Sequence, residues 1–209
     1  LQVNVADSVR AEDLITLNGF TLGVVDARTA TTIVGSLAEV QQVVVADSAS
    51  SVAIDVGRDT VSVVVTDTGS LSAESLNALD AYFGSGTVFV SASTVAGSMA
   101  ELTLASADSG AGGDLKLKPN VVMELVATGS ADTVSAQELL VLSARTTGVV
   151  DARGAETIRG DVAEMVALAG DSVGGQDTDG VARAPTAVVD LVSGPSMLAD
   201  SVLTIDGLY

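Results

Sequence analysis

The sequence of 209 residues contains no cysteine, no histidine and no tryptophan, and only 2% of its residues are aromatic. Without thiols the chain can form no disulfide and has no thiolate nucleophile. It also lacks the usual ligands of zinc and the side chain most often used in acid–base catalysis. These absences exclude the most familiar catalytic centres, and only Ser, Thr, Asp, Glu and Lys remain from which a reaction could be built.

Basic residues are scarce as well, since nine Lys and Arg stand against 27 Asp and Glu, for a net charge of −18. No basic face could be assembled to neutralise phosphates, so we expect no nucleic-acid partner. No apolar run approaches about 18 residues, so we also expect no insertion into a membrane. A strongly acidic chain attracts cations and stays soluble, which is typical of secreted or salt-exposed proteins.

Valine, alanine, serine, threonine, aspartate and glycine dominate what is present, and 47% of all residues are hydrophobic. That share is large enough for burial to offset chain entropy, so we expect a folded protein. A core of small and β-branched side chains with few aromatic anchors favours thin, regular layers.

The sequence repeats. The pentapeptide VVDAR occurs at 24–28 and again at 149–153, and a helical motif with an Ala/Glu pair before an apolar L-x-x-L step occurs seven times. Its first apolar residues are separated by steps of 26, 36, 26, 37, 26 and 37 residues. The period is therefore 62 to 63 residues, and each repeat has a short and a long half. The seven copies of the motif lie at 11–17, 36–43, 72–79, 98–104, 135–142, 161–168 and 199–205.

Each half is predicted to form a helix, a loop, a strand, a tight turn and a second strand. The helices are predicted from N-cap residues, with a glutamate three residues later that can complete a capping box. The predicted caps are Ser36, Ser72, Ser98, Ser135 and Asp161, and the predicted box residues are Glu39, Glu101, Glu138 and Glu164. The strands are predicted at 23–28, 31–35, 51–58, 61–67, 87–93, 93–97, 114–118, 121–128, 148–153, 156–160, 180–184 and 187–192.

The strands are near-continuous apolar runs such as VSVVV at 61–65, which is typical of parallel strands covered on both faces. We therefore predict an α/β solenoid, in which parallel strands stack in coils of about 26 and 36 residues with short helices on one side. The alternatives are an all-β solenoid or tandem small α+β domains. We expect residues 1–209 to form one continuous array, with units at 10–71, 72–134 and 135–197 and partial units at 1–9 and 198–209.

Five of the nine basic residues fall at the turn between the two strands of a half. They would line up along one edge of the stack. This edge stripe could bind a ligand or a partner, or each base could pair with a nearby acid such as Asp26, Asp55 or Asp151. The stripe consists of Arg28, Arg58, Lys118, Arg153 and Arg183.

An acidic, glycine-rich stretch, GDSVGGQDTDG, lies at 170–180. Oxygen ligands on such a loop suit Ca²⁺, and Asp171, Asp177 and Asp179 could converge on one ion. The stretch resembles the calcium-binding nonapeptide of secreted repeat proteins, but it occurs once. The alternative is an Asx-turn that closes the preceding helix. Calcium is the one cofactor that the sequence suggests.

Two carboxylates could serve a glycosidase, because some β-solenoids cleave acidic polysaccharides. Such a site usually stacks the sugar on aromatic rings, and the only aromatic pair is Tyr82-Phe83, in a one-residue insertion of the middle short half. We expect this pair to fill or cover a gap. The sequence predicts no enzyme and no catalytic residue.

Residues 72–102 and 135–165 resemble a repeat found in giant secreted or cell-surface proteins of bacteria, of the cyanobacterial, RTX-adhesin-like type. The resemblance implies an extracellular or cell-surface structural segment of a filament, surface layer, adhesion or motility scaffold. Its partners would be neighbouring repeats of the same or identical chains, and a glycan or surface protein. A second hypothesis is a solenoid module that binds a glycan or protein along the stripe, and a third is a polysaccharide-active enzyme.

Overall fold

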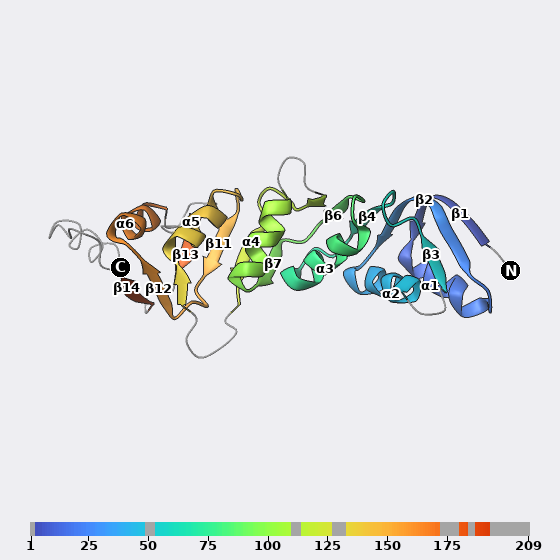
Figure 1. Ribbon diagram of the computed structural model, residues 1–209, viewed down its shortest axis with the longest axis horizontal. Helices are drawn as coiled ribbons and strands as arrows, with labels where there is room; N and C mark the ends of the chain where they lie inside the picture. Colours follow the sequence, from blue (N-terminus) through green and yellow to red (C-terminus); the bar gives the residue numbers. More distant parts are fainter. Residues whose placement is uncertain are drawn as a thin grey trace. The chain divides into compact units, whose positions relative to one another are not determined.

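The protein is an α/β protein with three all-parallel sheets, in which helices alternate with strands along the chain (Figure 1). The chain forms two compact units, Leu1–Ala92 with Asp108–Lys118, and Ser93–Ala107 with Pro119–Tyr209. The computed structural model describes residues 3–48, 53–109, 114–126, 133–171, 180–183 and 187–192.

The first unit contains three helices and seven strands among its described residues. Its elements are β1 (Val3–Arg10), α1 (Ala11–Phe20), β2 (Val25–Gly35), α2 (Leu37–Ser48), β3 (Ile54–Val56), β4 (Ser62–Val65), β5 (Ser70–Ser72), α3 (Ala73–Phe83), β6 (Val88–Val90) and β8 (Leu115–Lys116).

The second unit is built in the same way. Its elements are β7 (Thr94–Gly97), α4 (Met99–Asp108, whose last residue belongs to the first unit), β9 (Val122–Leu125), β10 (Thr133–Ser135), α5 (Ala136–Ser143), β11 (Val149–Ala152), β12 (Thr157–Gly160), α6 (Val162–Gly170), β13 (Gly180–Arg183) and β14 (Val188–Leu191).

All six helical motifs that fall within the described residues form helices, and the seventh, at 199–205, lies outside them. The first apolar residue of each of the six motifs is fully buried. These residues are Leu14, Val40, Leu76, Leu102, Leu139 and Met165. An all-β solenoid is therefore wrong, because the apolar stripes of these helices supply part of the core.

The capping boxes form in the long halves. The Ser36 backbone N–H donates to Glu39 Oε2 at 2.7 Å, while the Glu39 N–H donates to Ser36 Oγ at 3.3 Å. The same reciprocal pair links Ser98 to Glu101 and Asp161 to Glu164. In the short halves the helices follow directly on strands β1, β5 and β10. There Ser72 accepts a bond from the Ser75 N–H, but Ser135 makes no side-chain cap, so the box predicted with Glu138 is wrong.

Strand pairing follows the repeat. Within a repeat, each short-half strand pairs with its long-half equivalent, as β6 does with β8, β11 with β13, β7 with β9 and β12 with β14. At the repeat boundary, the second strand of a long half pairs with the first strand of the next short half, as β4 does with β6 and β9 with β11. Val63 lies opposite Val88, and Met123 lies opposite Val150, at equivalent positions. Equivalent strands therefore pair within a repeat, whereas non-equivalent strands pair across the repeat boundary.

Two further expectations about the strands are corrected. β2 runs without interruption from Val25 to Gly35, so the tight turn predicted after Arg28 is absent. Burial alternates along the strands, and Phe89 between buried Val88 and Val90 is 46% exposed. The strands are thus fully covered on one face only, because a pleated strand sends successive side chains to opposite faces.

Candidate functional site

The end of α2 carries a buried acid. Asp47 is only 4% exposed, and it belongs to the Asp-Ser pair that recurs at the exits of the long-half helices. A carboxylate is rarely buried unless positive or hydrogen-bonding groups surround it. We therefore take Asp47 and the groups around it as the candidate site of the first unit.

Asp47 accepts hydrogen bonds from three different segments. Its Oδ1 accepts the Val56 backbone N–H at 3.0 Å, at the end of β3. Its Oδ2 accepts Arg58 Nε at 2.7 Å, lies 2.7 Å from a terminal nitrogen of the same guanidinium, and also accepts the Tyr82 hydroxyl of α3. The carboxylate therefore joins α2 to β3 and, across the repeat boundary, to α3.

Aromatic rings complete this cluster. The Arg58 guanidinium lies 4.5 Å from the centre of the Tyr82 ring, and Tyr82 meets Phe83 edge to face at 5.1 Å. The hydrogen bond to Asp47 raises the pKa of Arg58. Burial, followed by the bond to Asp47, raises the pKa of Tyr82 to about 12. At neutral pH Tyr82 thus holds its proton, which suits a structural donor and not an acid–base catalyst.

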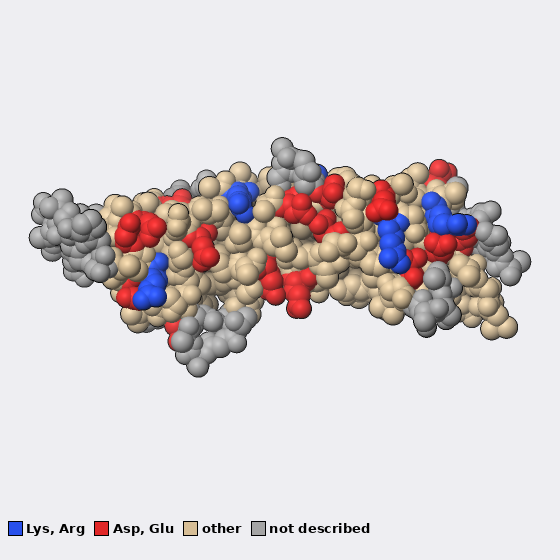
Figure 2. All heavy atoms as spheres, in the orientation of Figure 1, with Lys and Arg blue, Asp and Glu red and all other residues tan. Residues whose placement is uncertain are grey.

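On the face shown in Figure 2, basic side chains lie beside acidic ones. Two bases of the stripe occupy the same place in different repeats and make the same contact. Arg28 binds Asp26 through Nε at 2.9 Å and a terminal nitrogen at 2.6 Å, and its Nε lies 3.3 Å from Asp55 on the neighbouring strand. Arg153 binds Asp151 with the same two nitrogens. The bond from Arg153 lowers the pKa of Asp151.

Each of these arginines binds an acid whose partner on the neighbouring strand is a second acid. Asp26 is the register partner of Asp55, and Asp151 is the register partner of Glu124. Like charges opposite one another destabilise a sheet, and the guanidinium offsets that repulsion.

The remaining members of the stripe differ from these. Arg58 turns to Asp47, Lys118 is exposed beyond β8, and Arg183 is half-buried at the end of β13. Arg28, Arg58 and Arg153 each form an ion pair with an acid of their own repeat.

Only one of the three predicted calcium ligands can be placed. Asp171 follows α6, while Asp177 and Asp179 lie outside the described residues, so the calcium site stays a prediction. The backbone of Asp171 closes the helix, because its N–H donates to the Ala167 carbonyl at 3.0 Å. Nowhere in the described ranges do three or more acids come close enough together to hold a metal ion.

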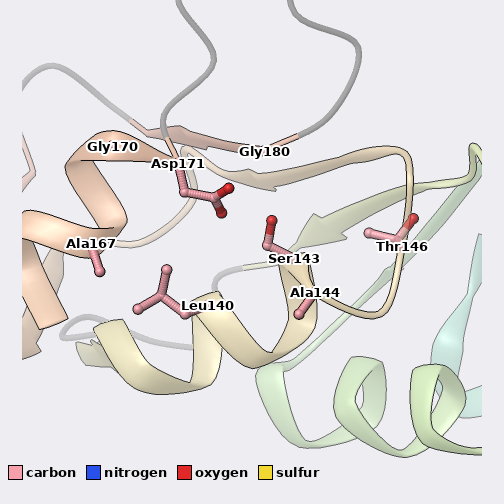
Figure 3. Close-up of a pocket in the computed structure, with 8 residues that line it drawn as sticks. All are labelled: Leu140, Ser143, Ala144, Thr146, Ala167, Gly170, Asp171 and Gly180. Carbon is pink, nitrogen blue, oxygen red and sulfur yellow. The ribbon is translucent and has the colours of Figure 1, made fainter.

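Asp171 also lines an open cavity of about 480 Å³ in the second unit. Its carboxylate and the Ser143 hydroxyl point toward the same space, between α5 and α6 (Figure 3). The wall is lined by Leu140, Ser143, Ala144, Thr146, Ala167, Gly170, Asp171 and Gly180. Asp171 is the one charged side chain among the described residues that line this cavity.

Sequence reasoning missed a pair of acids in the first unit. Asp80 of α3 has its pKa raised to about 7, first by burial and then by a hydrogen bond with Asp108 and the charges of Asp108 and Asp114. Asp80 lies 28 residues before Asp108 and 34 residues before Asp114, and it stands where the other short halves carry Asn18 and Ser143.

The chain matches no known protein family, no curated protein and no solved structure. Within the described parts, no helix has both the length and the apolar character needed to cross a membrane.

Proposed function

We propose that this chain is a structural repeat segment of a large extracellular or cell-surface protein that serves as a filament, surface layer, adhesion or motility scaffold. Its short and long halves stack as the coils of an α/β solenoid. The observation that carries the proposal is the pairing of the stripe: Arg28, Arg58 and Arg153 are bound to acids of their own repeat.

This pairing favours a scaffold over a ligand-binding module. A guanidinium recognises an anionic ligand best through its planar, two-pronged face. In Arg28 and Arg153 two nitrogens are already directed at a carboxylate two residues earlier. The Asp47 cluster is similarly closed, because its carboxylate is surrounded by donors of the protein itself.

The repetition of strand pairing supports the solenoid. Equivalent strands pair within a repeat, and at the two repeat boundaries within the described residues the second strand of the long half pairs with the first strand of the next repeat, so adjacent repeats share a sheet. Repeats that depend on nearest neighbours in this way are stable as arrays. The cysteine-free, acidic composition is compatible with export and with a salt-exposed location.

Location is tested by labelling cells of the source organism with an antibody raised against this chain. We expect intact cells to label as strongly as permeabilised cells, and brief protease treatment of intact cells to remove the signal. A cytosolic protein serves as the control for leakage. Labelling that requires permeabilisation would contradict the extracellular assignment.

A further inference from the structure

The loop between α1 and β2 exposes large apolar side chains. Phe20 is 86% exposed, Leu22 is fully exposed and Val24 is 41% exposed. Residues 18–25 carry no charge that would favour water. A contiguous exposed apolar loop commonly marks a surface that binds a partner. We call residues 20–24 the α1–β2 loop.

The repeat shows what this loop's equivalents do. The spacing of the two VVDAR copies aligns residues 20–23 with residues 145–148, and the middle short half supplies residues 83–86. In all three loops a glycine stands two residues before a fully buried valine of the next strand, Val25, Val88 or Val150.

Both equivalent loops dock on the preceding long half. Arg145 donates to the Thr103 carbonyl of α4 at 3.1 Å, and the Thr147 N–H donates to the Pro119 carbonyl at 3.0 Å. In the middle repeat, Ser85 Oγ donates to the Asp59 carbonyl at 3.0 Å. Each of these loops therefore contacts the preceding long half, at its helix or at the turn between its two strands.

The glycines of these loops are required by that contact. A Cβ at Gly148 would lie 2.1 Å from the Val121 carbonyl oxygen, and one at Gly86 would lie 2.3 Å from the Val61 oxygen. Both glycines are buried beneath the preceding turn, whereas Gly23 at the same position is half-buried.

The α1–β2 loop shares one internal hydrogen bond with the docked loop at residues 145–148. The Gly23 N–H donates to Thr21 Oγ1 at 3.0 Å, and the Gly148 N–H donates to Thr146 Oγ1 at 2.9 Å. A hydrogen bond that restricts a loop before binding lowers the entropy lost on association.

From these equivalences we infer that the α1–β2 loop is a docking surface for one further long half-repeat of the pattern found in this chain. Phe20 and Leu22 stand where the docked loop has Arg145 and Thr147. This partner assignment rests on the proposed repeat array, and it names the element that the array would place against the α1–β2 loop.

The experiment supplies that element covalently. Val3 pairs with Val25 as Met123 pairs with Val150 and as Val63 pairs with Val88. Residues 98–120, or alternatively 36–60, can therefore be joined to Leu1 with the register kept. We expect either extension to slow amide hydrogen exchange at residues 21–25 by about tenfold or more, relative to the unextended chain.

The double substitution Phe20→Ser with Leu22→Ser should remove this protection from the extended chain and leave β2 protected. Val45→Ser is the matched control, because Val45 is 70% exposed on α2, outside the loop. If neither extension slows exchange at residues 21–25, the loop is not such a surface and the inference fails. Surface labelling of cells is independent of this result, so the two proposals can fail separately.

Discussion

Replacing Asp47 with alanine tests whether the cluster at the end of α2 stabilises the first unit. The substitution leaves the buried Val56 N–H without its acceptor and removes the partner of the half-buried Tyr82 hydroxyl. Each lost acceptor of this kind costs about 1–3 kcal/mol. Arg58 is 47% exposed on its side chain, so water can solvate it after the loss. We expect a total loss of about 2–4 kcal/mol in the free energy of unfolding of this unit.

Urea unfolding followed by tyrosine fluorescence measures this loss. The chain has no tryptophan and two tyrosines, so Tyr209→Phe in every variant leaves Tyr82 as the only reporter. Asp59→Ala is the matched control, because Asp59 lies exposed in the neighbouring turn and its removal makes the same change in charge. A loss within about 0.5 kcal/mol of that control would refute the structural role of Asp47.

Two other substitutions test local features. Asp80→Asn tests the raised pKa of Asp80: the folded chain favours its protonated form, so its stabilisation is complete below the ordinary value of 3.8 and is lost as pH rises through about 7. The variant should therefore melt about 2–4 °C higher than the parent at pH 8 and equally at pH 4, and a gain at pH 4 alone would contradict the assignment. Gly148→Ala should destabilise the second unit by about 1–3 kcal/mol, because its Cβ meets the Val121 carbonyl. Gly170→Ala, with open space around it in α6, should be neutral or stabilising by up to about 1 kcal/mol in the same melt, and equal effects of the two would contradict the close approach.

The helices could be predicted from the sequence because their signals are local. In the long halves a cap, an acid three residues later and an apolar step mark the start of each helix. All six described motifs begin within one residue of the observed helix. Strands β5 and β10 were missed, because SLS and TVS are too short and too polar to show a strand pattern. The pairing of β4 with β6 joins residues 25 positions apart, and nothing in either strand specifies it.

The contacts of the candidate site could likewise be predicted only in part from the sequence. The pairing of Arg28 with Asp26 could be predicted, because the two lie two residues apart at the end of one strand. The partners of Asp47 are 9, 11 and 35 residues away, so no local sequence pattern identifies them. Tyr82 was expected to fill or cover a gap, and its bond to Asp47 depends on how a helix packs across a repeat boundary.

Removing one complete repeat tests most directly whether this chain is an array of equivalent units. Deleting residues 73–135 joins Ser72 to Ala136, which repeats the Ser-Ala junction found at both places and gives β4 a new partner in β11 in place of β6. We expect the shortened chain to fold, with cooperative unfolding and protected amides in β2, β4, β11 and β12. Deleting residues 73–124 instead removes less than one full repeat, so helices and strands no longer follow in the order of the repeat. This shortened chain should not fold. If the in-phase deletion unfolded the chain as completely as the out-of-phase one, the repeats would not be equivalent units.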